Sequence, residues 1–140
     1  MKLKPDCMRA VLLQLERELT YATNESGAIE KNFLTLEELD GLIVAFSKED
    51  IFYSLSNLEQ AGYIRMKANW TTTGLYSCWI FDLTFLGHEF LDKIRDEKAW
   101  SQIQTGMEAV RNYSLDAITA IANGVASAAI SAYLAKNPVT

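Results

Sequence analysis

Apolar residues at helical spacing mark the first part of the chain. Behind Pro5, which suits a first helical turn, one apolar stripe predicts a helix that ends before a loop at residues 22–27. Two further helices are predicted, and each starts at a cap: Thr35, with Glu38 three positions later, and then Ser47. The residues expected on the buried sides of these helices are Met8, Val11, Leu12, Leu15, Leu19, Leu39, Leu42, Ile43, Phe46, Ile51, Leu55 and Leu58, with Ala61 behind them.

A period of two replaces the helical period after Gly62, which supplies a left-handed helix stop. Residues 63–68 and 75–83 predict a β-hairpin that is joined by a turn-like run at 69–74. A short segment at 28–34 could pair with it. The second strand is apolar on both faces, so we expect it in the middle of the sheet. One face has Trp79, Phe81 and Leu83, and the other has Cys78 and Ile80.

Three more helices are predicted after the hairpin. Thr84 caps the first of them, and Gly87 lets this helix approach the hairpin closely because it has no side chain. A charged stretch is followed by a second helical pattern, and Ser114 caps a last helix over residues 114–136. The apolar residues expected on the buried sides of the first two are Leu86, Phe90, Leu91 and Ile94, and then Trp100, Ile103 and Met107.

The last helix has an apolar seam whose spacing alternates between three and four residues, as in a heptad repeat. Its small residues permit close approach of a second helix, so pairing in a homodimer and packing on its own domain are both open interpretations. A transmembrane helix is a third, which Asn123, Gly124 and the many alanines disfavour. The seam residues are Leu115, Ile118, Ala122, Val125, Ala129 and Ala132.

This order of elements predicts an α+β, mostly helical fold. Its core is a winged helix-turn-helix with a β-hairpin wing, followed by C-terminal helices. We expect a winged-helix-like domain at residues 1–100 and a helical extension at 101–140 that contains the dimerisation helix 114–136. The third helix then takes the place of a recognition helix, beside the wing.

Composition and charge limit the classes of function that the sequence supports. The 140 residues have a formal net charge of −5, which disfavours indiscriminate binding to polyanions. His88 is the one histidine, and a lone imidazole has no catalytic geometry by itself, so we expect no enzyme. Cys7 and Cys78 have no metal-binding spacing, and we expect neither a metal nor a cofactor. With no apolar segment after Pro5, the chain is expected in the cytoplasm, without a membrane.

The third helix and the wing offer side chains for nucleic acid. Asn and Gln pair with adenine edges, and Lys, Ser and Tyr reach phosphates. Against this, Glu49, Asp50 and Glu59 lie on the same helix, which has no arginine. Phe52 and Tyr53 fit equally well under another part of the protein or under a protein partner. The candidate residues for DNA or partner contact are Lys48, Phe52, Tyr53, Ser56, Asn57, Gln60, Arg65, Lys67 and Trp70.

Several runs of the sequence resemble one family. They are residues 1–9, 58–64, 83–100 and 114–116, and the run from Gly87 to Trp100 is the most specific. Together they resemble the bacterial and phage-associated domain of unknown function 2513. The resemblance implies a bacterial, often prophage-encoded, cytoplasmic protein and brings no catalytic residues. Two hypotheses follow: a dimeric DNA-binding regulator of phage or prophage type, and a module for protein–protein contact that does not bind DNA.

Overall fold

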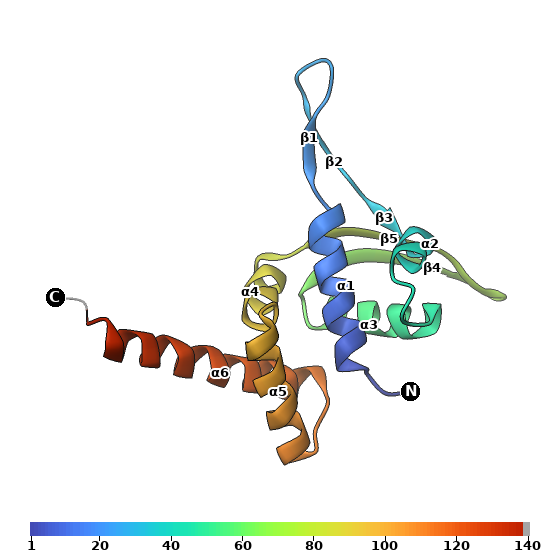
Figure 1. The fold of residues 1–140 in the computed structure, drawn as a ribbon. Coiled ribbons are helices and arrows are strands. Elements are labelled where there is room, and N and C mark those ends of the chain that lie inside the picture. Colours follow the sequence, from blue (N-terminus) through green and yellow to red (C-terminus); the bar gives the residue numbers. More distant parts are fainter. Residues whose placement is uncertain (139–140) are drawn as a thin grey trace.

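The computed structural model of the chain describes residues 1–138 and shows a mostly helical α+β fold with two small antiparallel sheets (Figure 1). The helices are α1 Pro5–Glu18, α2 Leu36–Leu42, α3 Lys48–Gln60, α4 Phe85–Ile94, α5 Glu97–Val110 and α6 Leu115–Lys136. The strands are β1 Tyr21–Thr23, β2 Ile29–Lys31, β3 Leu34–Thr35, β4 Ile64–Thr71 and β5 Gly74–Leu83.

The expected helix caps are all present. Thr35 and Glu38 form a capping box, in which the Thr35 hydroxyl accepts from the Glu38 N–H at 3.1 Å. The hydroxyls of Ser47, Thr84 and Ser114 likewise accept from backbone N–H groups in the first turns of α3, α4 and α6. The local sequence therefore determines where these helices begin.

Strand β5 lies between β3 and β4, as its two apolar faces predicted. The register shifts between Arg65 and Met66 of β4, so Phe81 of β5 is an extra, bulged residue. The bulge moves Leu83 to the buried face with Ile80, whereas simple alternation had wrongly placed it with Phe81.

Two predicted loops are smaller than expected. Residues 22 and 23 are not loop but belong to β1, which pairs with β2 in a hairpin that projects from the body (Figure 1). Asn24 closes this hairpin by accepting from the N–H groups of Ser26 and Ala28. In the larger hairpin Thr71 already pairs with Gly74, so the predicted turn at 69–74 is reduced to two residues. Aromatic and β-branched residues extend the strands into it.

The helical faces are largely as predicted, with three exceptions. Leu42 is exposed because α2 ends there, and Leu39 and Ile43 cover the core instead. Leu86 is exposed because Gly87, its neighbour, turns toward the hairpin. Ala61, at the end of α3, is also exposed.

Gly87 confirms the expected close approach. A Cβ at this position would lie 2.0 Å from the carbonyl oxygen of Tyr63, immediately before β4. A side chain here would push α4 away from the sheet, so the packing of α4 depends on glycine.

The C-terminal helices continue the core without a gap. Helix α5 spans residues 100 and 101, so the boundary expected between them falls inside a helix. Along α6, Leu115, Ile118 and Ala122 are buried against α4 and α5, whereas Ala129 and Ala132 are exposed. By length and composition alone, helix α6 is also long and apolar enough to cross a membrane, and little of it is buried.

Candidate interaction surface

Helix α3 turns one side to the core and the other to solvent. Ile51, Leu55 and Leu58 are fully buried, as predicted. On the opposite side the middle of the helix is only half-exposed, and it is fully open at its two ends. The half-exposed residues are Phe52, Tyr53, Ser56 and Asn57, and the exposed residues include Lys48 and Gln60.

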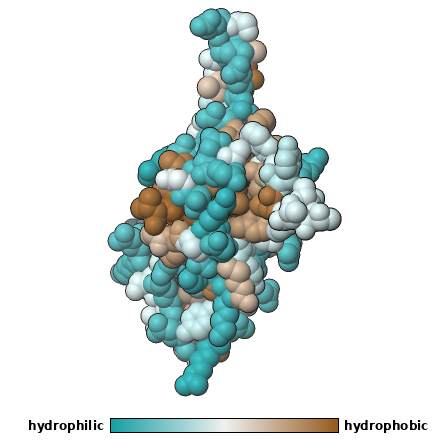
Figure 2. Space-filling model, turned by 90° about the vertical axis from the view of Figure 1, so that its right-hand side faces the viewer, coloured by the Kyte–Doolittle hydropathy of each residue, from teal (hydrophilic) through white to brown (hydrophobic). Residues whose placement is uncertain are grey.

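An aromatic pair connects α3 with the hairpin. The rings of Phe52 and Trp70 lie 5.7 Å apart, edge to face. Trp70 shares a side of β4 with Ala68, which faces the helices, but it lies beyond the edge of the core and is 64% exposed. We call Phe52 and Trp70 the aromatic pair. Figure 2 faces the end of the molecule with α2 and the hairpin tip, where apolar surface gathers beside polar surface.

The structure does not bring Arg65 and Lys67 to this pair. Lys67 lies opposite Trp79 in the sheet, and both are exposed on the face that points away from the helices. Arg65 is on that face too, opposite Asp82. Because successive side chains of a strand alternate, Arg65 and Lys67 cannot share a face with Trp70. The predicted nine-residue set therefore divides into two surfaces.

The outer face of the sheet is a second aromatic surface that the sequence interpretation missed. The rings of Phe33 and Phe81 meet edge to face at 5.3 Å, and Trp79 lies near them on β5. Lys31 pairs with Asp82, while burial and the nearby charge of Arg65 lower the pKa of Lys31. The two-residue alternation along β5 could have predicted that Trp79 and Phe81 share a face. No local pattern could have predicted that Phe33 joins them, because Phe33 is far away in the chain.

Charge around the start of α3 is largely neutralised within the chain. Lys4 donates to Asp50 at 2.7 Å and lowers the pKa of that carboxyl, and Lys48 donates to Glu37 at 3.3 Å. Glu49 stays exposed one turn before Phe52. Phosphate contact at this end of α3 would require these cations to leave their carboxylates.

The middle of α3 is partly covered by distant segments. Tyr53 and Asn57 line a groove of about 440 Å³ with the N-terminal residues Lys2 and Leu3 and the connection between α5 and α6. The amide of Asn57 donates to the carbonyl of Tyr53 at 2.9 Å. Two of the six predicted contact residues on α3 therefore face other parts of the same chain. The connection and the first residue of α6 contribute Arg111, Asn112, Tyr113, Ser114 and Leu115, which no local spacing could have associated with α3.

His88 and its neighbour Glu89 are exposed on α4, and the described residues contain no group of three side chains suited to hold a metal. Both cysteines are buried free thiols. Burial raises the pKa of Cys7 and raises that of Cys78 to about 11, so both stay protonated near neutral pH.

The residues with the most specific polar contacts join α1 to α4 and α5. Arg95 binds Glu16 with both guanidinium nitrogens, at 2.7 and 2.5 Å, and lowers the pKa of that carboxyl. Arg9 donates to the carbonyl of Ile94 at 2.8 Å. The indole N–H of Trp100 donates to Asp6 at 2.9 Å. We call this set the α1–α4–α5 joint.

The comparisons with known proteins agree with the resemblance. A model of the family DUF2513, described as a hypothetical protein, matches residues 2–113. An uncharacterised protein of Haemophilus influenzae is 29% identical over 128 residues, which cover 91% of this chain and 97% of that protein. No solved structure matches the chain significantly. Asp6, Arg9, Gly87 and the 92–100 segment lie within the matched region and build the scaffold, so family membership does not locate a functional site.

Proposed function

The chain belongs to the DUF2513 family of hypothetical proteins, and we propose that it is a non-enzymatic, winged-helix-like module that binds a protein partner through the aromatic pair. Three helices followed by a long hairpin, with α2 and α3 joined by a short connection, support the winged-helix assignment. Because one fold can serve many functions, we infer the kind of partner from the exposed side chains and not from the fold.

The exposure of Trp70 is the observation that carries this proposal. A tryptophan that is 64% exposed and braced by Phe52 offers a large, rigid apolar area to a partner. Tryptophan is enriched among the residues that dominate protein–protein binding energy, since its burial removes much apolar surface from water at a low entropy cost. The outer-face Trp79 is less exposed and has Lys67 beside it.

The charges near the pair indicate the chemistry of the partner. Glu49 is exposed one turn before Phe52, and Glu59 is exposed further along α3. The whole chain has a formal net charge of −5. A partner that fits this surface offers an apolar side chain to Trp70 and Phe52, with lysine or arginine around it. Such charges would act mainly on the rate of association and on specificity.

Duplex DNA binding by α3 is the competing proposal. The observation that favours it is the position of Lys2 and Arg111, two cations in the groove beside Tyr53 and Asn57. Specific duplex binding needs several phosphate contacts and an open recognition helix. The half-covered middle of α3 and its exposed carboxylates speak for the protein partner instead.

Affinity capture from the native cells tests the proposal with a matched pair of variants. Trp70→Ser removes the exposed ring of the aromatic pair, and Trp79→Ser removes the exposed ring on the opposite side of the same hairpin. We expect the wild type and Trp79→Ser to retain the same protein, and Trp70→Ser to lose it. Retention by all three chains, or loss only with Trp79→Ser, would refute the assignment to the aromatic pair.

A second experiment addresses DNA. Fluorescence anisotropy of a labelled random-sequence duplex at low salt should stay unchanged on addition of the chain. Salt-dependent binding that Arg111→Ala weakens would favour the competing proposal. Arg17→Ala is a suitable control, because Arg17 is an exposed cation on α1 outside the groove.

A further inference from the structure

We propose that two copies of the chain associate by exchanging the ends of α6. Residues 126–136 of each α6 lie, in this assembly, in the groove between α6 and the α4–α5 corner of the other copy. The interface is isologous, so each chain both gives a helix end and receives one. The residues involved differ from the aromatic pair, so the two proposals stand or fall separately.

The two halves of α6 have opposite surroundings. Leu115, Ile118 and Ala122 of the first half are buried against α4 and α5. The second half projects from the body into solvent (Figure 1), where Ile130 is 60% and Tyr133 is 64% exposed. The apolar seam therefore begins in the contact of α6 with α4 and α5, and it continues along the exposed second half of the same helix. A helix that projects with large apolar side chains needs a partner to stabilise it.

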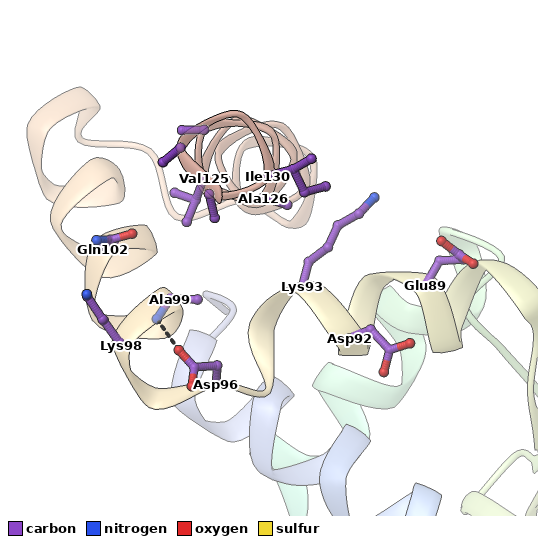
Figure 3. A pocket seen from close by; sticks show the side chains of 13 residues that line it. Glu89, Asp92, Lys93, Asp96, Lys98, Ala99, Gln102, Val125, Ala126 and Ile130 are labelled. Atoms are coloured by element: carbon purple, nitrogen blue, oxygen red, sulfur yellow. Dashed lines mark hydrogen bonds between the residues drawn. The ribbon is translucent and has the colours of Figure 1, made fainter. Parts of the chain in front are cut away.

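A groove of about 760 Å³ lies where α6 leaves the body. In Figure 3, Val125, Ala126 and Ile130 extend from α6 along one side of it, and α4 and the start of α5 form the other. Lys93 bridges the two sides by donating to Asn123 at 2.7 Å. This bond fixes the spacing of the two walls at one end, and the alanines of α6 take up little of the groove between them. The α4–α5 side includes Glu89, Asp92, Asp96, Lys98, Ala99 and Gln102.

The surface area of the chain is large enough for such an interface. A compact monomer of this mass exposes about 7,300 Å². This chain exposes 8884 Å². The excess is roughly 1,600 Å². The projecting α6 and β1–β2 hairpin both add exposed surface (Figure 1), and a stable dimer needs only about 800 Å² from each partner.

A second copy fits the projecting half better than a membrane does. About 11 residues project, which is roughly 16 Å of helix, and the hydrocarbon core of a bilayer is about 30 Å thick. Spanning it would also require Leu115, Ile118 and Ala122 to leave the core. Alanine and serine dominate the projecting half, and they gain little from lipid but allow close helix packing.

Light scattering and sedimentation of the full chain test the proposal. The wild type should be a dimer at micromolar concentration. Ala129→Glu, which places a charge in the groove, should produce a monomer with unchanged helix content. Ala120→Glu is the matched control, since it adds the same charge at an exposed position on the first half of α6, outside residues 126–136 and the groove lining, and the dimer should persist. A monomeric wild type, or equal behaviour of the two variants, would overturn the proposal.

Cysteine crosslinking tests the exchange itself. Two separately made chains, Gln102→Cys and Ile130→Cys, should form a mixed disulfide dimer when combined and oxidised, because each residue lies on one side of the groove. Crosslinking only between two Ile130→Cys chains would instead indicate direct pairing of the helix ends and would refute the exchange. Flotation of the wild type with anionic phospholipid vesicles, without dimer formation, would assign α6 to a membrane surface and also refute it.

Discussion

The α1–α4–α5 joint and the aromatic pair use similar residues in opposite ways. In the joint, Trp100 is 5% exposed, and its indole N–H is bonded to Asp6. At the hairpin, Trp70 is 64% exposed and meets the ring of Phe52 edge to face. The joint satisfies its polar and aromatic groups within the chain, whereas the pair leaves apolar area for another molecule.

Family membership does not distinguish the two regions, because the aromatic pair lies inside the matched residues 2–113 just as the joint does. The joint and Gly87 lie inside the matched residues 2–113, and they hold α1, α4 and the sheet together. A family can be recognised through such scaffold residues while its function lies in exposed side chains elsewhere. Variants in the joint should therefore change stability, and variants of the pair should change binding.

The largest effect is expected at Gly87. Gly87→Ala would place a Cβ against the Tyr63 carbonyl, so α4 must shift, at a cost of about 3 kcal/mol and a fall in Tm of roughly 10 °C. Gly124→Ala is the control, because a Cβ there meets open space and the helix gains up to about 1 kcal/mol. Thermal unfolding followed by circular dichroism measures both. Equal Tm values for the two variants would show that the close approach does not matter.

The buried thiol of Cys78 makes the stability of the scaffold depend on pH, and no such dependence is expected from the exposed aromatic pair. The pKa of Cys78 is about 11 in the folded chain against 9.0 ordinarily, so its stabilisation is complete below pH 9 and is lost as pH rises toward 11. The loss is on the order of 2 kcal/mol by pH 11. Guanidinium unfolding across this range should show a smaller decline for Cys78→Ala. A thiol reagent should also react slowly with the native chain at pH 8, and fast modification would contradict the burial of both cysteines.

A smaller effect is expected for the ion pair in the joint. Arg95→Gln should lower the free energy of unfolding by about 1 kcal/mol at pH 7, since both partners are partly exposed. Arg95 lowers the pKa of Glu16, so this contribution is present above the ordinary value of 4.5 and is lost as pH falls through the lower folded-state value. The difference from wild type should therefore shrink in acid. Arg17→Gln, which changes an exposed cation on α1 next to Glu16, should have no effect at either pH.

The smallest stability effect is expected at the aromatic pair. Trp70→Ser should change the free energy of unfolding by less than about 0.5 kcal/mol, because most of the ring already contacts water. Denaturant unfolding checks this, and it also shows that loss of a partner is not loss of fold. A destabilisation above about 2 kcal/mol would mean that Trp70 belongs to the core.

Much of the fold followed from local sequence signals. Thr35, Ser47, Thr84 and Ser114 were found as caps because each acts within its own first turn. The central position of β5 followed from its two apolar faces. Leu83 was misplaced because a bulge changes alternation without any fixed local sequence.

The candidate surface was less predictable than the fold. The position of the hairpin determines whether Phe52 of α3 contacts Trp70, and the sequence of α3 alone does not specify that position. Tyr53 shares a groove with residues 111–115, which are far away in the chain. Arg65 and Lys67 were grouped with α3 because all belonged to a wing and recognition helix in the sequence interpretation. Their alternation with Ala68 and Trp70 already showed that they face away from α3.

Photocrosslinking in the native cells tests the central claim most directly. Trp70 and Trp79 are each replaced, in separate chains, by p-benzoylphenylalanine, which keeps an aromatic ring at both positions. The account predicts a protein adduct from position 70 and none of the same mass from position 79. An adduct from position 79 alone, or an adduct with nucleic acid at position 70, would contradict a protein-binding role for the aromatic pair.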